Sequence, residues 1–404
     1  MKKILLANKF FYPRGGDCVH TLNLMQLLQS KGHQVAVFSM HYPENLPSEW
    51  QFYFADEVRF SGGDRLKALE RIFGGAGVRA RFEKLLDDFQ PDIVHLHNIH
   101  SYLSPVLAEI AARRGIPVFW TLHDYKLLCP AYSCLCGGKT CERCFAHSKM
   151  PVLTSRCMKG SLLASALAYL EALYWNRTKL EGWVNTFVCP SKFMASKMEQ
   201  GGFAAEKLKV LCNFISSSYS ESLPPSPEGE AEREEAYCYV GRLSAEKGVE
   251  TLLKAASQLP YKLYVAGDGP LAGSLREKYG HCSQIVWLGR ITPDEVRTLL
   301  GRVRFSVMPS ECYDNNPISV IESLCMGTPL LGARIGGIPE LIDEGMTGMT
   351  FESGNEEELK AKIHTMFTPS VTFARRDRMR AEALERFSPE NYYERLNELY
   401  NGKQ

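Results

Sequence analysis

Residues 237–257 read YCYVGRLSAEKGVETLLKAAS, which is the pattern of a strand, a glycine-containing loop and a helix in immediate succession. The apolar run 237–240 predicts the strand, and the residues from Val249 to Ser257 predict the helix. Between them lie Arg242 and Lys247. An arginine can grip two phosphate oxygens and a lysine adds a point charge, whereas a cation near a helix N-terminus opposes the helix dipole unless an anion binds there. The stretch therefore predicts a parallel sheet with an anionic ligand at the end of this strand.

The same alternation of strands and helices continues in both directions along the chain. Further strand-like runs lie at 4–7, 35–38, 93–96, 118–121, 186–189, 262–266, 285–288 and 305–308. A polar, proline-rich stretch that cannot bury a core begins at residue 216 and interrupts the pattern. We expect an α/β protein of two Rossmann-like, doubly wound parallel-sheet domains facing across a cleft: residues 1–216, a linker at 217–235, and residues 236–386.

Composition narrows the class of protein. With 45% hydrophobic and 23% charged residues, the 404-residue chain is typical of globular proteins, not of disordered or collagen-like ones. The net charge of +1 hides an asymmetry, since residues 1–215 hold 26 Lys and Arg against 18 Asp and Glu, a net of +8. That excess is too dilute for a nucleic-acid groove, so we expect no nucleic-acid partner, but it suits an anionic ligand or an anionic membrane surface.

No targeting or membrane-spanning segment is expected. The first apolar run ends at Ala7, before the polar Asn8, and is too short for a signal peptide. The most apolar stretch, 161–175, is shorter than the ~20 residues that span a bilayer, and it contains Glu171. We therefore expect a cytoplasmic protein.

Residues 309–322 carry a second candidate site, again from a strand end into a helix. Glu322 interrupts an apolar run and needs hydrogen-bond donors, which sugar hydroxyls or backbone amides can supply. Asp314 lies eight positions earlier, in the loop before the helix. In the first half of the chain, Gly15 and Gly16 precede a predicted helix start near Asp17, where the backbone can approach an anion closely or simply form a tight turn.

These segments resemble the retaining nucleotide-sugar transferases of glycosyltransferase family 4, which have the two-domain GT-B fold. The resemblance covers nearly the whole chain, in a shared order of short motifs: Gly15-Gly16, the His-rich 94–98, 121–124, Gly241-Arg242 with Lys247, 267–270, 287–290, the acidic segment 309–322, 327–329 and 336–340. The family's paired acids are Glu and Glu eight positions apart, whereas here the first is Asp314, one methylene shorter, and the second is Glu322.

The resemblance implies a role for each matching residue. Arg242 and Lys247 clamp the donor diphosphate, Glu322 holds the ribose hydroxyls, and the backbone around Arg290 and Ile291 faces the base. The other matching residues are Gly15 and Gly16, which approach the diphosphate; Asp314 and His123, which contact the transferred sugar; and Ile318 and Ser319, whose amides bind phosphate. It also implies that the last helix, within 387–404, crosses back to complete the N-terminal domain.

The expected chemistry is sugar transfer without a metal. The chain has no Asp-x-Asp motif, and Arg242, Lys247 and helix N-termini can stabilise a diphosphate leaving group, so no cofactor is required for catalysis. Retention of configuration implies that the departing phosphate takes the acceptor's proton, and a role of His123 as a base is a hypothesis.

A cluster of six cysteines between residues 129 and 157 suggests a structural zinc site. Cys141 and Cys144 have the Cys-x2-Cys spacing of zinc ligands. Cys129 and Cys157 could complete four thiolates, with Cys134, Cys136 and His147 as further candidates. Unligated thiols or redox chemistry are the alternatives.

Two helical regions in the first half of the chain suggest that the acceptor is a glycan or a lipid-linked saccharide at a membrane. The predicted helical region 64–88 is basic, and residues 162–175 supply Leu, Tyr and Trp, so peripheral contact with the inner face of the plasma membrane is one interpretation and a solvated basic face beside a core helix is the other. The basic residues are Arg65, Lys67, Arg71, Arg79, Arg81 and Lys84. Two alternatives to polysaccharide synthesis stay open: a related enzyme with a small soluble acceptor, and a non-catalytic nucleotide-sugar binder.

Overall fold

The computed structural model describes residues 1–58, 65–145, 148–223, 233–369 and 371–402. The chain divides into two compact units. The first contains Met1–Cys136, Cys141–Cys212 and Tyr393–Gln404, and the second contains Gly137–Thr140 and Asn213–Tyr392. The predicted linker 217–235 holds helix α9 (Ser217–Glu221) and the first residues of strand β9 (Glu234–Val240), while its central part, 224–232, lies outside the described residues.

The first unit is built on a six-stranded sheet in the order β2-β1-β3-β4-β7-β8. Every pairing in it is parallel. The strands are β1 (Lys3–Ala7), β2 (Gln34–Phe38), β3 (Ile93–Leu96), β4 (Val118–Thr121), β7 (Thr186–Cys189) and β8 (Leu208–Val210). Its helices are α1 (Gly16–Ser30), α2 (Arg65–Ile72), α3 (Ala76–Phe89), α4 (Val106–Arg113), α5 (Met150–Thr154), α6 (Leu162–Tyr174), α7 (Arg177–Trp183) and α8 (Lys192–Gln200). A small hairpin, β5 (Leu135–Cys136) and β6 (Lys139–Thr140), follows β4.

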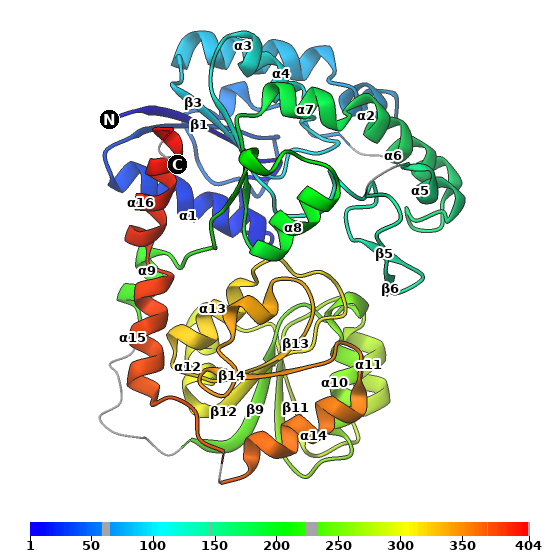
Figure 1. Ribbon diagram of the computed structural model, residues 1–404, viewed down its shortest axis with the longest axis vertical. Coiled ribbons are helices and arrows are strands. Elements are labelled where there is room, and N and C mark those ends of the chain that lie inside the picture. Colours follow the sequence, from blue (N-terminus) through cyan, green and yellow to red (C-terminus); the bar gives the residue numbers. More distant parts are fainter. Residues whose placement is uncertain (59–64, 146–147, 224–232, 370, 403–404) are drawn as a thin grey trace. The chain divides into compact units, whose positions relative to one another are not determined.

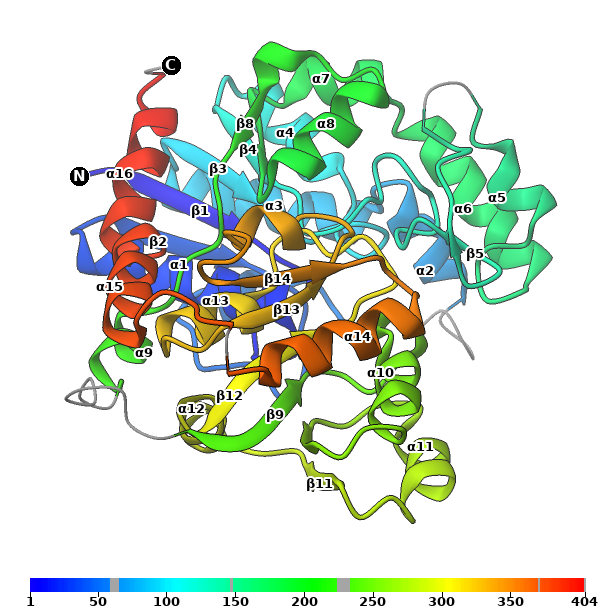
Figure 2. The same cartoon turned by 60° about the horizontal axis from the view of Figure 1, so that its bottom comes forward.

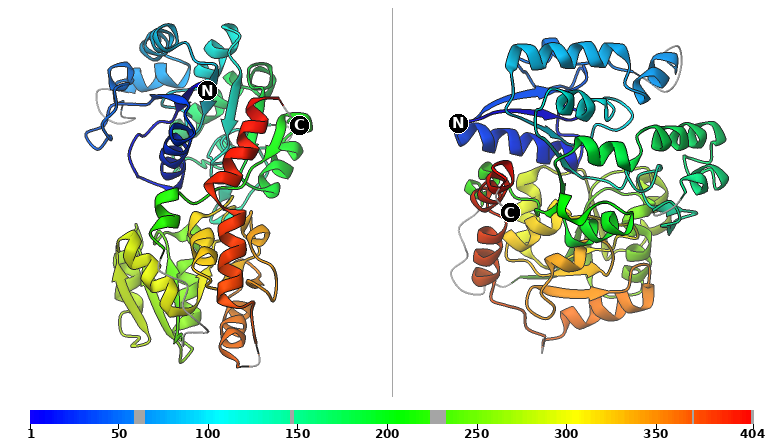
Figure 3. Two further views of the ribbon diagram at one scale, coloured as in Figure 1. Left: turned by 90° about the vertical axis from the view of Figure 1, so that its left-hand side faces the viewer. Right: turned by 45° about the horizontal axis from the view of Figure 1, so that its top comes forward.

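The second unit repeats this architecture with the order β11-β10-β9-β12-β13-β14, again parallel throughout. Its further strands are β10 (Lys262–Ala266), β11 (Ile285–Gly289), β12 (Val303–Met308), β13 (Leu330–Ala333) and β14 (Gly348–Phe351). Its further helices are α10 (Val249–Ala256), α11 (Ala272–Tyr279), α12 (Pro293–Arg302), α13 (Ile318–Cys325), α14 (Glu356–Phe367) and α15 (Arg376–Arg386). Figure 1 shows helices on both faces of each sheet, and Figure 3 shows this layering from two other sides.

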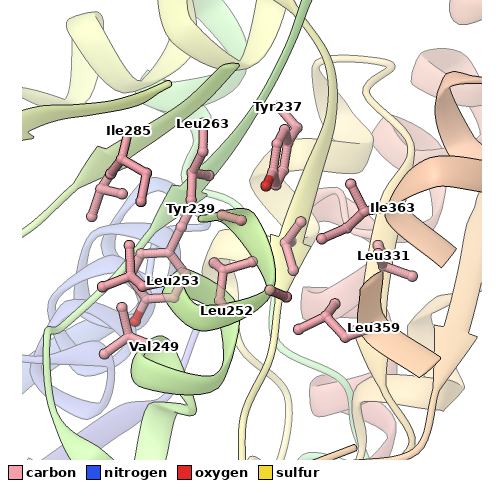
Figure 4. Close-up of a cluster of buried hydrophobic side chains, with 14 of the residues drawn as sticks. Tyr237, Tyr239, Val249, Leu252, Leu253, Leu263, Ile285, Leu331, Leu359 and Ile363 are labelled. Atoms are coloured by element: carbon pink, nitrogen blue, oxygen red, sulfur yellow. The ribbon is translucent and has the colours of Figure 1, made fainter. Parts of the chain in front are cut away.

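The core of the second unit explains why the central residues of its strands are mostly apolar. On one face of the sheet, Tyr237 and Leu263 pack with Leu252 of α10 and Leu359 of α14 (Figure 4). On the other face, Ala236 and Cys238 lie in a cluster with Leu299 and Leu300 of α12. Strands covered on both faces have no polar side to alternate with. The predicted α/β class and the two parallel sheets are therefore confirmed.

The last helix, α16 (Pro389–Tyr400), ends against the first unit. The Tyr400 hydroxyl lies 2.6 Å from His95 Nδ1 of β3, and the Tyr393 hydroxyl lies 2.8 Å from His33 Nε2. Arg395 donates to the carbonyl of Val210 at the end of β8. Residues from Tyr393 onward thus pack on a sheet built from the opposite end of the chain.

Candidate active site

Strand order places the predicted ligand loops of the second unit at one edge of its sheet. In parallel α/β sheets, ligands bind beyond the carboxyl ends of the strands where the order of connection reverses. Here β9 lies between β10 and β12, so this point falls at the ends of β9 and β12. The loop 241–248 leaves β9 there, and the loop 309–317 leaves β12.

Gly248 allows these two loops to approach each other. It joins the short helical turn Ala245–Lys247 to α10 with a φ of 63°, in the left-handed region that favours glycine. A Cβ atom at this position would lie 1.9 Å from the carbonyl oxygen of Pro309. Any side chain at position 248 would therefore separate the loop that carries Lys247 from the loop that carries Asp314.

The close approach creates an ion pair between two predicted site residues. Lys247 Nζ lies 2.5 Å from Asp314 Oδ1, and both side chains are largely buried. Burial by itself would lower the pKa of Lys247, but attraction to Asp314, Cys312 and Glu246 outweighs it and raises that pKa. Arg242, in contrast, is exposed and forms no ion pair within the described ranges.

The loop around Asp314 is held by polar contacts that the sequence did not reveal. Ser310 donates a hydrogen bond to Asp314 Oδ2, and the amide of Gly337 donates to the Asp314 carbonyl at 2.7 Å. Glu311 accepts a hydrogen bond from Thr251 Oγ1 of α10 at 2.5 Å. Glu311 therefore bonds α10 and not the Asp314 loop. Only the closeness of Ser310 to Asp314 in the sequence could have pointed to its contact with that residue.

Helix α13 begins directly after this loop. Pro317 is its N-cap and provides no side-chain capping bond. Ile318 and Ser319 form its first turn, where backbone amides have no acceptor within the helix. The structure thus places these two predicted phosphate ligands at a helix start, four and five positions after Asp314.

A pocket of about 570 Å³ brings together three other predicted donor ligands. Arg290, Ile291 and Glu322 all line it. Its remaining wall consists of Val240, Thr292, Pro293 and Val296. Burial raises the pKa of Glu322 to about 7, and the charge of Arg297 acts in the opposite direction. A carboxyl group, a backbone segment and apolar walls thus line one cavity in the second unit.

The loop 290–292 is fixed by the start of α12. Thr292 caps this helix and forms a reciprocal pair with Glu295, in which each side chain bonds the other's backbone amide. Arg297 pairs with Asp294 and lies over the ring of Tyr219, 5.2 Å from its centroid. These contacts fix the start of α12, which supplies Thr292, Pro293 and Val296 to the pocket wall.

In the first unit, Gly15 and Gly16 lie where α1 begins. Gly15 is the N-cap in an extended conformation, with φ −160°. A Cβ atom at Gly16 would meet no atom of the chain within 4 Å, so the packing of the protein does not itself require glycine there. Asp17 follows, and its carboxylate accepts a hydrogen bond from Asn98 Nδ2 at 2.9 Å. Burial would raise the pKa of Asp17, but His123, Lys9 and Asn98 together lower it.

His123 lies in a cluster of three imidazoles. Its Nε2 is 3.1 Å from Nδ1 of His97, and one ring nitrogen each from His20, His97 and His123 lie within 4.8 Å of one another. Burial lowers the pKa of His123, although Asp17 and Asp124 act in the opposite direction. The sequence pointed to His123 but not to His20 or His97 as its neighbours, because the three come from α1 and from the ends of β3 and β4.

The cysteines do not form the expected group of four in the described part of the chain. Cys129, Cys141, Cys144 and Cys157 are not brought within 4.8 Å of one another, a distance that the three imidazoles satisfy. Cys129 instead accepts a hydrogen bond from the thiol of Cys134, which lowers the pKa of Cys129 to about 6. Arg143 lies 3.3 Å from the sulfurs of both Cys136 and Cys141. His147 lies outside the described residues.

The basic residues of α2 and α3 differ in burial and in partners. Arg71 is buried and donates to the Asp56 carbonyl at 2.7 Å. Arg79 pairs with Glu109 and Arg81 with Asp56, while the Lys84 ammonium lies 4.8 Å from the Phe52 ring centroid. Membrane contact of this region and a solvated basic face beside a core helix both stay predictions.

Comparison with sequences places the chain among known glycosyltransferases. It is 25% identical over 354 residues to sulfoquinovosyl transferase SQD2 of Arabidopsis thaliana, an alignment that covers 85% of the chain and 62% of the relative. The chain thus spans less than two thirds of that relative's length. It is also 24% identical over 417 residues to the alpha-monoglucosyldiacylglycerol synthase of Streptococcus pneumoniae, covering 98% of the chain and 84% of the relative.

Solved structures share the fold. The lipopolysaccharide outer core galactosyltransferase WaaB matches with a TM-score of 0.67 and 16% identity, and the alignment covers 100% of both chains. The Anabaena protein Alr3699/HepE, solved in complex with UDP-glucose, matches with a TM-score of 0.64 and 18% identity, again over 100% of both chains.

Two family descriptions account for almost the whole chain. Residues 225–386 match glycosyl transferases group 1. Residues 14–219, half of the chain, match Glycosyltransferase Family 4. The chain therefore belongs to glycosyltransferase family 4 and has the GT-B fold of two parallel-sheet units.

Proposed function

We propose that this glycosyltransferase moves a sugar from a nucleotide-diphosphate sugar, UDP- or GDP-linked, to a glycan or lipid-linked saccharide in cell-surface polysaccharide synthesis. The observation that carries the proposal is the pocket lined by Arg290, Ile291 and Glu322 in the unit that also holds Arg242 and Lys247. Such a pocket has room for a nucleoside, and the two cations are suited to a diphosphate. Complexes of the Anabaena relative with UDP and with UDP-glucose support a sugar-nucleotide donor.

In the proposed complex, the ribose hydroxyls donate hydrogen bonds to the Glu322 carboxylate while the base lies against the 290–292 backbone. Arg242 and Lys247 bind the diphosphate, with the first amides of α13 at Ile318 and Ser319 as further donors. Asp314 accepts hydrogen bonds from the transferred sugar. Its ion pair with Lys247 is one that the donor diphosphate must break or share when it binds the lysine.

The transfer step needs only groups of this kind. The bond between the anomeric carbon and the diphosphate oxygen breaks, and the bond to the acceptor oxygen forms on the same face. The departing phosphate oxygen takes the acceptor's proton, and Arg242 and Lys247 stabilise the negative charge that develops. Configuration is thus retained without a general base, and a divalent metal is not needed as a Lewis acid.

The first unit supplies the candidate groups for the sugar and acceptor. His123 is half-buried beside His97, and burial keeps its imidazole neutral, so its ring nitrogens can exchange hydrogen bonds with sugar hydroxyls. Gly16 leaves open space at the start of α1, which suits a ligand that approaches the backbone. A lipid-linked acceptor is supported by the similarity to the glucosyldiacylglycerol synthase, and it implies a cytoplasmic enzyme peripheral to the inner face of the plasma membrane.

A donor-hydrolysis assay tests the function. The chain is screened with UDP, GDP and ADP sugars, first by thermal shift and then for slow release of nucleoside diphosphate. We expect stabilisation by one donor and release that persists in excess EDTA. Glu322→Gln and Arg242→Ala should each abolish the release, whereas Lys254→Ala, on the exposed side of α10, should retain it. Stabilisation without any release in the presence of candidate acceptors would instead indicate a non-catalytic binder.

A further inference from the structure

Helix α6 is inverted relative to an ordinary surface helix. Its buried residues are Ser165, Ala168 and Glu171, while its exposed large side chains are almost all leucine. Leu163 is 71% exposed and Leu170 is 49% exposed, whereas Glu171 is only 5% exposed. Helices of globular proteins normally turn the apolar stripe inward and the charged side chains outward.

The exposed apolar residues form one continuous stripe. Residues three, four or seven apart share a helix face, and Leu163, Leu167, Leu170 and Tyr174 follow this spacing. We define the apolar face of α6 by its exposed members, Leu162, Leu163, Leu170, Leu173 and Tyr174. Met150 of α5 is exposed as well, and Figure 2 shows α5 and α6 side by side. These six account for more than half of the exposed large hydrophobic side chains in the described ranges.

Polar contacts on the inner side hold the helix in this orientation. Glu171 Oε2 lies 2.9 Å from Lys126 Nζ, and both side chains are buried. Ser101 Oγ donates to Glu171 at 2.8 Å, and Ser165 Oγ accepts a hydrogen bond from the Met158 amide at 3.1 Å. Because rotating the helix would bury leucines only by exposing or unpairing this ion pair, the apolar face is a stable feature of the fold.

Basic residues flank the apolar face along the sequence, and one of them, Arg177, also pairs with Glu181. Residues 149–179 hold Lys149, Arg156, Lys159, Arg177 and Lys179 but only one acid, Glu171. Lys159 and Arg177 are exposed close to the two ends of α6, and the Lys179 ammonium lies 4.3 Å from the ring centroid of Tyr174. An apolar stripe with aromatic and cationic residues at its ends is the pattern of a helix that lies in the headgroup region of an anionic membrane.

We propose that the apolar face of α6 docks this protein on an anionic lipid bilayer, with Lys159 and Arg177 contacting acidic headgroups. No helix in the described ranges combines the length and apolarity that crossing a bilayer requires, so the contact is an insertion of side chains parallel to the surface. Leu173 also lines a pocket of about 340 Å³ together with Lys126, Glu171 and Trp175. A lipid-linked acceptor could reach this pocket from the bilayer surface, and only this last step rests on the proposed function.

Sedimentation with vesicles tests the proposal on the full-length chain. We expect the wild-type chain to sediment with phosphatidylcholine–phosphatidylglycerol vesicles at low salt and much less with phosphatidylcholine alone. Leu163→Glu combined with Leu170→Glu should lower the bound fraction at least about tenfold, because each substitution places a charge among lipid tails and headgroups. Phe52→Glu with Met346→Glu is the matched control, since both side chains are exposed outside α6, and it should bind as the wild type does.

Two further measurements make the outcome decisive. If the Leu163→Glu, Leu170→Glu variant does not fold, Leu163→Trp replaces it, and its fluorescence should shift to the blue and be quenched by spin-labelled lipid. Three results overturn the proposal: no sedimentation of the wild-type chain, equal binding by the double variant and the control, or a tryptophan that the lipid does not quench. A wild-type dimer that the double variant converts to a monomer also overturns it, because the apolar face would then bind a second copy of the chain. Donor hydrolysis, measured without vesicles, is expected to be unchanged in the double variant, so a failure of docking is distinguishable from a failure of the proposed function.

Discussion

The ammonium of Lys247 and the carboxylate of Asp314 form a 2.5 Å ion pair at the ends of two adjacent strands, 67 residues apart in the sequence. Under the proposed function, Lys247 binds the diphosphate of the donor and Asp314 binds its sugar. The pair would then couple the two roles, because a diphosphate that binds Lys247 competes with Asp314 or shares the lysine with it.

Removal of Lys247 and removal of the Asp314 charge are expected to change diphosphate binding in opposite directions. Lys247→Ala should weaken binding of the nucleoside diphosphate at least about tenfold, because a charge-assisted contact is lost. Asp314→Asn should strengthen binding of the diphosphate several-fold, because the competing anion is gone, yet it should lower sugar transfer. Isothermal titration and turnover measurements separate the two effects. Equal affinity in Asp314→Asn and the wild type would show that the pair does not compete with the ligand.

Glu322 is expected to make the stability of the second unit depend on pH. Its pKa of about 7 in the folded chain exceeds the ordinary value of 4.5, so between these values the folded state binds more protons and stability falls as pH rises. Above pH 7 the loss amounts to about 3 kcal/mol at most. Glu322→Gln should therefore melt at the same temperature as the wild type near pH 4 and at a higher one near pH 8. Glu277→Gln, on the exposed side of α11, should show no such divergence.

Gly16→Ala is expected to leave the stability of the fold unchanged while it weakens binding of the donor. The added methyl group meets no protein atom within 4 Å, and alanine is a better helix residue than glycine, so the melting temperature should be unchanged or slightly higher. If a donor phosphate approaches the backbone here, KM for the donor should rise about tenfold. Gly77→Ala, also in a helix with open space around it, is the control and should leave KM unchanged.

His123→Ala is expected to lower turnover at least about a hundredfold through loss of hydrogen bonds to the sugar. Because burial keeps the pKa of His123 below its usual value, protonation of this imidazole should not limit activity between pH 7 and 8. The exposed His281 provides the control, since His281→Ala should behave as the wild type. Unchanged turnover in His123→Ala would exclude it from the site.

Zinc in the cysteine-rich segment stays a prediction that metal analysis can decide. If these thiols gather around zinc when the metal binds, a chain purified without a histidine tag should contain zinc, Cys144→Ser should lose it, and Cys189→Ser, in the buried strand β7, should keep it. Fewer than about 0.2 zinc ions per wild-type chain would dismiss the site. If His97→Ala loses zinc and Cys144→Ser keeps it, the metal is bound by the three imidazoles and not by the thiols.

Much of the fold was predictable because parallel strands that are covered on both faces are apolar throughout. All nine strand-like runs found in the sequence are strands of the two sheets. The strands β8, β13 and β14 were not predicted. Of these, β13 contains Gly332, and β8 is only three residues long and half-buried, so neither shows a long apolar run. The positions of the site motifs in the sequence were predictable, since each follows a strand end. The contacts between residues of different motifs were not.

The order of residues by itself determined that two α/β units follow one another, that cationic and acidic loops lie at strand ends, and that α6 is rich in leucine. Tertiary structure alone decided which loops meet, because the order of strands in a sheet is set by packing between residues far apart in the chain. It paired Lys247 with Asp314, gathered Arg290, Ile291 and Glu322 around one pocket, and turned Glu171 inward toward Lys126. The contact between Glu171 and Lys126 explains why the leucines of α6 face outward. Leaving a buried carboxylate without its cation costs more free energy than exposing the leucines to solvent.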